Sequence, residues 1–139
     1  MNNTVKSVDL WRDTGWFAIH TKSRRENFAA ANVSALGIGI LLPLVKVEHL
    51  TRGDPQGAVK PLFPGYFFAR FCPEISYASV KCSRGVLRVV SSGKFPIPVH
   101  DAVVQEIRHR IKRDGLIRLR REFWHRAREF RFRTALLKG

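Results

Sequence analysis

The sequence has few cysteines, few acidic residues and no long apolar run, and each shortage excludes a class of protein. Cys72 and Cys82 form neither a Cys-x-x-Cys motif nor a disulfide framework, so we expect both thiols to be reduced and partly buried. The five histidines are scattered rather than grouped at metal-ligand spacing, so we expect no metal and no other cofactor. No run reaches the roughly 18 apolar residues of a membrane span, and Met1 to Asp13 has no secretory signal. We expect a cytoplasmic protein that does not bind a membrane.

The motifs of catalysis are also missing. Ser92-Gly93-Lys94 lacks the upstream glycine of a phosphate-binding loop, and Gly37-Ile38-Gly39 fits a helix end better than a dinucleotide fingerprint. The 11 acidic residues are thinly spread, and no acid/base pair stands out among them. The sequence therefore predicts a protein that is not an enzyme. A nucleic-acid enzyme whose site only the fold assembles is the least favoured alternative.

Basic residues are what the sequence has in excess. Lys and Arg number 25 against 11 Asp and Glu, which gives a formal net charge of +14 in 139 residues. Residues 105–139 alone hold 12 basic and 4 acidic side chains, a net charge of +8. Such an excess favours a polyanionic neighbour, because it exceeds what solubility requires. A solvated basic face, or a basic RNA-binding or ribosome-associated module, has the same composition and stays an alternative.

The first third of the chain predicts a strand and a helix. Residues 1–14 have no periodicity and are expected to form a flexible leader, so that order begins at Trp16. Residues 16–21 are β-prone and predict a strand. Ser23 and Glu26 have the spacing of a capping box, so a helix should follow. Helical spacing puts Ala29, Val33 and Leu36 on the inward face of this helix. Gly37 is expected to end it.

The middle third predicts strands and a distinctive aromatic segment. Residues 39–52 are apolar and β-prone but are interrupted by Pro43, which fits a bend or an edge, and residues 51–57 read as a loop. A Pro-Gly turn then opens into Tyr66-Phe-Phe-Ala-Arg-Phe71, a strand expected near the centre of the sheet. Alternation puts Phe67, Ala69 and Phe71 on one face and Tyr66, Phe68 and Arg70 on the other. Both faces therefore carry aromatic rings.

The last third predicts a short helix, a strand and a longer helix. Residues 73–80 fit a helical turn, residues 83–90 fit a strand, and Asp101 is expected to cap a helix that ends before Gly115. That helix should turn four residues inward: Val103, Val104, Ile107 and Ile111. The order β-α-β-β-β-(α)-β-α over residues 15–115 predicts an α+β fold, an antiparallel sheet of about four or five strands flanked by helices. In the basic remainder, a helix fits Leu116, Leu119 and Phe123, whereas a strand fits Phe130 and Phe132.

Several short motifs occur together in a recognisable order. They are Trp16-Phe17, Thr21-Lys22, Arg25-Glu26, Pro61-Leu-Phe-Pro-Gly-Tyr-Phe-Phe68, Arg84-Gly-Val86 and Pro96-Ile-Pro98. Each is weak alone, but in this order and at these intervals they are fairly specific. From about Trp16 to Gly115 the chain resembles the N-terminal domain of the NusG-like transcription elongation factors.

The resemblance implies an elongation or antitermination factor that binds RNA polymerase, bridges its DNA channel and works as a monomer. The patch on the clamp helices of polymerase would be His20, Phe63, Tyr66, Phe68, Val104 and Ile107. Periodicity alone favours ordinary packing for Tyr66 and Phe68, and the resemblance reverses that preference. A second polymerase contact would fall at Ser76, Tyr77 and Ala78. Upstream or non-template DNA would be met by Lys22, Arg24, Arg25, Lys81 and Arg84.

Two details of the resemblance concern subdivision and length. The Pro-Leu-Phe-Pro-x-Tyr-x-Phe form is similar to specialised, RfaH-like antiterminators, in which a His-Thr-Thr triplet makes the second contact; here Ser76-Tyr77-Ala78 stands instead. The family normally ends in a KOW β-barrel, and Phe130 to Gly139 resembles the first strand of that barrel and then stops. Residues 116–139 are therefore expected to be a basic linker and an incomplete barrel start.

Overall fold

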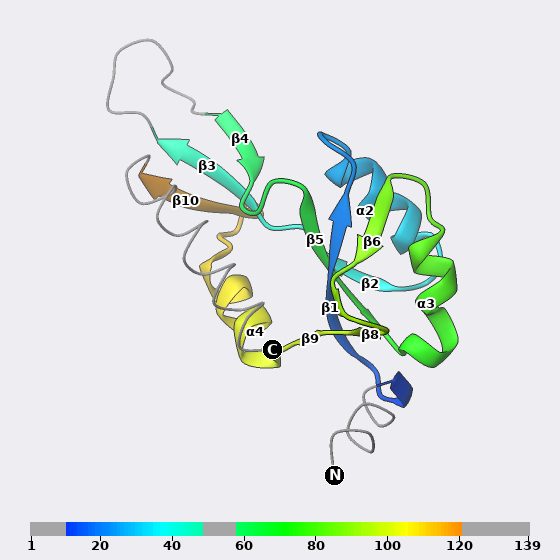
Figure 1. Cartoon of the computed structure of the whole chain (residues 1–139). Coiled ribbons are helices and arrows are strands. Elements are labelled where there is room, and N and C mark those ends of the chain that lie inside the picture. Colours follow the sequence, from blue (N-terminus) through cyan, green and yellow to red (C-terminus); the bar gives the residue numbers. More distant parts are fainter. Residues whose placement is uncertain (1–10, 49–57, 121–139) are drawn as a thin grey trace.

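One antiparallel sheet organises the part of the chain that the computed structural model describes, residues 11–48 and 58–120 (Figure 1). Its five strands are β1 (Gly15–Thr21), β2 (Gly39–Leu41), β5 (Tyr66–Phe71), β6 (Val86–Val89) and β9 (Pro98–Val99). They run in the order β2-β5-β1-β6, with β9 paired to the first half of β1. Every neighbouring pair is antiparallel. The predicted sheet is confirmed.

Within the described residues, three helices flank this sheet, as predicted: α2 (Glu26–Ser34), α3 (Pro73–Lys81) and α4 (Asp101–Arg110). In Figure 1, α2 and α3 lie on one side of the sheet and α4 lies on the other. Pro73 occupies the first turn of α3, where its missing N–H costs no hydrogen bond. The α+β fold expected from the sequence is therefore the fold that the chain adopts.

The two faces of the sheet have separate apolar cores, because β1 and β5 alternate in register. Under α2 and α3 lie Phe17, Ile19, Phe67, Ala69 and Phe71, all buried. Under α4 lie Trp16, Ala18 and Phe68, also buried. The pairing of Ala18 with Phe68 and of Phe17 with Ala69 brings each set together. The predicted division of the aromatic strand between two faces is confirmed, and both faces are covered by the chain itself.

A second sheet, which the sequence did not predict, also covers the α4 face. It consists of β3 (Leu44–Glu48), β4 (Ala58–Pro61) and β10 (Leu116–Arg120) in the order β10-β3-β4. The buried Pro43, between β2 and β3, lacks the N–H that a continuous strand would need, so the chain bends there and leaves the first sheet. β10 pairs in parallel with β3, and Val45 and Ile117 enter the core under α4. The helical interpretation of residues 116–120 is therefore wrong.

Both predicted helix caps are wrong. α2 begins at Glu26 after Arg25, with no side-chain cap, and Arg24 before it adopts a positive φ of 59°. The chain is thus in a left-handed turn, and not in the conformation of a capping box, when it enters the helix. α4 is preceded by His100, and Asp101 is its first residue instead of its cap. Because α2 ends at Ser34, Leu36 lies beyond it and stays 47% exposed instead of turning inward.

Contacts with the rest of the chain begin before β1, at Trp11. The Trp11 ring packs against Tyr77 of α3 at a centroid distance of 5.2 Å and against Phe95 at 6.2 Å. The Cys72 thiol donates a hydrogen bond to the Arg12 carbonyl oxygen at 3.0 Å. Phe95 belongs to a small hairpin of β7 (Ser91–Ser92) and β8 (Phe95–Pro96). Residues 1–10 of the expected leader, the loop at residues 51–57 and the barrel start at residues 121–139 lie outside the described residues.

The loop between α3 and β6 packs tightly on α2 at Gly85. A Cβ atom at this position would come within 3.0 Å of both Ala29 Cβ and Phe28 Cδ1, and the φ of Gly85 is +90°. We expect Gly85→Ala to lower the free energy of unfolding by about 2 kcal/mol or more, because left-handed strain and overpacking add. Gly37→Ala is the matched control: its φ is +83° but nothing lies within 4 Å of the added Cβ. That variant should lose only about 1 kcal/mol in denaturant titrations. Equal losses would contradict the packing argument.

Candidate nucleic-acid and protein interfaces

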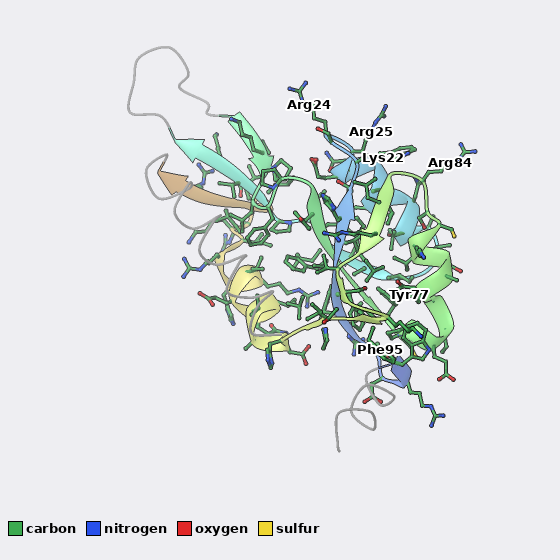
Figure 2. The ribbon with its side chains drawn as sticks, in the orientation of Figure 1. Lys22, Arg24, Arg25, Tyr77, Arg84 and Phe95 are labelled. Atoms are coloured by element: carbon green, nitrogen blue, oxygen red, sulfur yellow. The ribbon has the colours of Figure 1, made fainter. Side chains whose placement is uncertain are left out.

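Four of the predicted nucleic-acid residues gather at one end of the molecule, where β1 leads into α2 (Figure 2). We call Lys22, Arg24, Arg25 and Arg84 the basic end; all four side chains are exposed. Two hydrogen bonds hold the two loops together: the Lys22 amide donates to the Gly85 carbonyl at 2.9 Å, and Asn32 Nδ2 donates to the Arg84 carbonyl at 2.9 Å. Lys22 and Arg84 therefore lie on neighbouring loops of one surface, although they are 62 positions apart in the sequence.

Lys81, the fifth predicted residue, is exposed in the last turn of α3. Its ammonium group lies 6.0 Å from the centre of the Tyr77 ring, at the far limit of a cation–π contact. Lys81 contacts the middle of its own helix, whereas the backbone hydrogen bonds of Lys22 and Arg84 join the two loops of the basic end to each other and to α2. Lys81 thus extends the positive surface along α3.

The basic end also carries an aromatic ring, Phe28, which was not among the predicted site residues. Phe28 is 45% exposed, and the guanidinium carbon of Arg25 lies 5.7 Å from the centre of its ring. The signal in the sequence was the Arg25-x-x-Phe28 spacing, which puts both side chains on one face of a helix. The propensity pattern did not reveal it, because an apolar residue near an apolar stripe is ordinarily counted as core.

The predicted clamp-facing patch divides into buried and half-exposed residues. Four of its six members are core residues under α4, each at most 6% exposed: Phe63, Phe68, Val104 and Ile107. The Phe63 and Phe68 rings meet edge to face at 5.7 Å. His20 and Tyr66 are half-exposed, and their rings stack at 4.6 Å with an interplanar angle of 14°. We call these two residues the stacked pair.

The stacked pair lies at the edge of the core between the central sheet and α4. His20 follows buried Ala18 on the same face of β1, and Tyr66 precedes buried Phe68 on the same face of β5. Partial burial, and then the positive charge of Arg88 across the strand pair, lower the pKa of His20 below its ordinary value. The imidazole is therefore neutral in neutral solution. The pair presents two stacked rings, and Arg88 lies across the strand pair from His20.

The three residues of the predicted second contact lie in the middle of α3. Ala78 is exposed, and Ser76 and Tyr77 are half-buried. The Tyr77 ring packs against Trp11, so another part of the chain already covers one side of the Tyr77 side chain. Ser76 and Ala78 are accessible on the surface of α3 to a partner protein.

The described residues hold no group of three or more His, Cys, Asp and Glu side chains that a metal ion would need. Cys82 is exposed and not partly buried as expected, whereas Cys72 is half-buried; both thiols are free. Among the described ranges there is also no helix of the length and apolarity required to cross a membrane.

Comparison with known proteins agrees with this architecture. The sequence model of the family described as "Transcription termination factor nusG" matches residues 14–108. The "Transcription termination/antitermination protein NusG" of Thermus thermophilus is 30% identical over 118 residues, which cover 73% of this chain and 62% of that protein. A solved structure described as "Domain interaction in Thermotoga maritima NusG" matches with a TM-score of 0.50 and 28% identity, over 70% of this chain and 56% of that one. The chain thus spans about three fifths of the length of these relatives.

The comparisons support the resemblance at the level of the family and not of its subdivision. None of them singles out an RfaH-like form, which stays a prediction. The family is one of transcription factors, which agrees with the expectation that the chain is not an enzyme. The matched span includes the central sheet and both α2 and α3, together with the basic end and the stacked pair. With a family match over most of its length and a relative of this identity, the chain belongs to the NusG family.

Proposed function

We propose that the chain is a transcription elongation or antitermination factor that binds RNA polymerase, bridges its DNA channel and contacts upstream or non-template DNA. Membership of the NusG family supports the general role. The observation that carries the rest is the adjacency of the stacked pair and the basic end. His20 and Lys22 are separated only by Thr21, whose amide donates to the Gly65 carbonyl beside Tyr66 at 2.8 Å. RNA polymerase would bind at the stacked pair, and DNA would bind beside it at the basic end.

The polymerase contact is assigned to the stacked pair, because it is the half-exposed remainder of the predicted clamp-facing patch. Phe63 and Phe68 are buried in the core that the pair adjoins, and Tyr66 packs against that core. A half-buried, neutral aromatic pair suits the centre of a protein interface, where rings supply contact area at a low entropy cost. Phe63, Phe68, Val104 and Ile107 would act by shaping and supporting this surface and not by direct contact.

The second polymerase contact is assigned to Ser76 and Ala78 on α3, with Tyr77 held toward Trp11. α3 and the stacked pair are associated with opposite faces of the central sheet, since the core under α3 contains Phe67 and the core beside Tyr66 contains Phe68. Two contacts separated by the thickness of the sheet suit a factor that spans a channel. A small residue such as Ala78 allows close approach of a partner backbone.

The DNA contact is assigned to the basic end. Residues 22–28 and 81–88 contain six Lys and Arg side chains and a single acidic one, Glu26. Phosphate binding by such residues is driven by counterion release and depends on salt. Arg24 keeps a large charged side chain at φ 59°, a conformation that costs a non-glycine residue about 1 kcal/mol or more. Strain of this kind is typical of functional positions.

Removing the stacked pair should weaken polymerase binding. We expect His20→Ala combined with Tyr66→Ala to raise the Kd for core RNA polymerase by about 10-fold or more, since buried aromatic anchors commonly contribute about 2 kcal/mol. Binding is measured by titration of labelled protein, and circular dichroism verifies that the variant is folded.

Leu36→Ala is the control for the polymerase experiment, because Leu36 is 47% exposed and lies beyond α2, far along the chain from the pair. It should bind polymerase as the unaltered chain does. Unchanged affinity in the folded double variant would reject the assignment of this surface.

Neutralising the basic end should weaken nucleic-acid binding without weakening the fold. We expect Lys22→Gln, Arg24→Gly and Arg84→Gln together to reduce the slope of log K against log salt by about 2. Arg24→Gly relieves a positive φ, so the stability of this single variant should stay unchanged or rise by up to about 1 kcal/mol. A loss of binding therefore cannot come from unfolding at that position. The slope is measured with a labelled transcription bubble between 50 and 200 mM salt.

The control for charge is a triple variant that loses the same three charges elsewhere: Arg12→Gln, Lys94→Gln and Lys112→Gln, all exposed. If both triple variants lose affinity equally, only net charge matters and the basic end is a solvated face. Tight RNA binding by an unaltered chain that does not bind polymerase would instead favour the RNA-binding or ribosome-associated alternative.

A further inference from the structure

The Trp11 ring contacts two other rings, both far from it in the sequence. Its centroid lies 5.2 Å from that of Tyr77 on α3, at an interplanar angle of 48°, and 6.2 Å from that of Phe95, edge to face. Figure 2 shows Tyr77 and Phe95 at the opposite end of the molecule from the basic end. This aromatic cluster is therefore a feature separate from the basic end.

Trp11 covers a residue of the predicted second polymerase contact. Tyr77 is half-buried and packs against the core under α2 and α3. The Trp11 ring covers a further part of the Tyr77 side chain, whereas Ala78, the next residue of α3, is exposed. One member of the predicted contact is thus covered by the chain itself while its neighbour is accessible.

The attachment of residues 11 and 12 to α3 is weak. Pairing of β1 with β5 begins at Gly15 and Phe71, so the ladder of the central sheet does not include Trp11 or Arg12. The Cys72 thiol supplies the hydrogen bonds that tie these two residues to the start of α3, at 3.0 Å to the Arg12 carbonyl oxygen and 3.8 Å to that of Trp11. A thiol is a weak donor. A segment held by ring contacts and a weak donor opens at a lower free-energy cost than the strands it precedes.

We propose that residues 11 and 12 form a releasable strap that inhibits the second polymerase contact by covering Tyr77. This inference rests on the proposed contact of α3 and adds a regulatory step to it. In the closed form Ser76 and Ala78 meet polymerase, and in the open form the Tyr77 ring adds its area to the interface. Aromatic rings dominate the energetics of such interfaces. Because polymerase binds the open form more tightly, the closed strap lowers the apparent affinity.

Removing the Trp11 ring tests the inference through an increase in affinity, which an unfolded variant cannot produce. We expect Trp11→Ala to lower the Kd for core RNA polymerase, measured without nucleic acid, by about 3- to 10-fold, the factor by which an aromatic pair stabilises a closed form. Phe28→Ala is the matched control, because it removes a ring that is 45% exposed at the basic end. Its Kd should be unchanged. An unchanged Kd for folded Trp11→Ala would overturn the inference.

A second variant opens the strap without removing a ring. Cys72→Ala deletes the thiol donor and leaves Trp11, Tyr77 and Phe95 in place. It should lower the Kd for polymerase in the same direction by a smaller factor, about 2-fold, because a weak hydrogen bond contributes less than the ring contacts. A Cys72→Ala variant that is folded by circular dichroism and binds more weakly would count against the strap.

The double variant Trp11→Ala with Tyr77→Ala identifies the ring that the strap covers. It should bind polymerase no more tightly than Tyr77→Ala alone, because without Tyr77 the strap has no contact residue to cover. An increase in affinity that survives in the double variant means that Trp11 acts at another place, and the inference fails.

The reactivity of the Cys72 thiol measures the opening of the strap directly. In a Cys82→Ser background Cys72 is the one thiol of the chain, and its alkylation by iodoacetamide is followed by mass spectrometry. Alkylation should be about 3- to 10-fold faster in Trp11→Ala than in the chain that retains Trp11, because the strap covers the thiol when closed. Equal rates in the two chains would show that Trp11 does not hold the strap closed.

Ala78→Glu distinguishes this inference from the contact on which it rests. It should raise the Kd for polymerase by about 10-fold, because an unpaired carboxylate would be buried in the interface of α3. If Ala78→Glu weakens binding while Trp11→Ala changes nothing, the second contact stands and the strap fails. If neither variant changes the Kd, the second contact and the strap both fail.

Discussion

The central sheet is covered on both of its faces, and this constraint determines where the molecule can meet a partner. α2 and α3 seal one apolar core, and α4 with the second sheet seals the other. Such burial is the main source of stability in a domain of this size. Partners are left with the ends of the strands and the outer surfaces of the helices. The stacked pair and the basic end both lie at the C-terminal end of β1, where His20 and Lys22 are no longer buried.

Covering both faces also changes what the aromatic strand does. Of the four rings in Tyr66-Phe-Phe-Ala-Arg-Phe71, three are buried and belong to the two cores, and Tyr66 alone is half-exposed. Phe68 therefore stabilises the sheet, as its periodicity indicated, while Tyr66 lies beyond α4 and stacks on His20. Because His20 is kept neutral by partial burial and by Arg88, this edge is apolar in character although it adjoins strongly positive loops. An apolar surface at His20 and a positively charged one at Lys22 are thus separated by a single residue at the end of β1.

Local pattern predicted the main sheet, its alternation and its three helices, because these depend on the spacing of apolar residues along short segments. It failed where long-range packing decides. Nothing in residues 116–120 shows that they pair with β3, more than 60 residues away. Ser23 and Glu26 have capping-box spacing, yet the hydrogen bond from the Lys22 amide to Gly85 turns the chain before the helix and leaves Arg24 at positive φ. Burial of Phe63 and Val104 likewise depends on the second sheet, which alternation alone does not reveal.

The same long-range contacts explain why the basic end is a defined surface and not merely a charged one. Lysine and arginine side chains on flexible loops attract phosphate without preference for its form. Here Gly85 packs against Ala29 and Phe28, and Asn32 holds the Arg84 carbonyl, so that two loops and one helix keep fixed relative positions. Charged groups held on such a surface lose less conformational entropy when a ligand binds than groups on mobile loops do. The fixed geometry of the basic end thus depends on the close packing of Gly85 against α2.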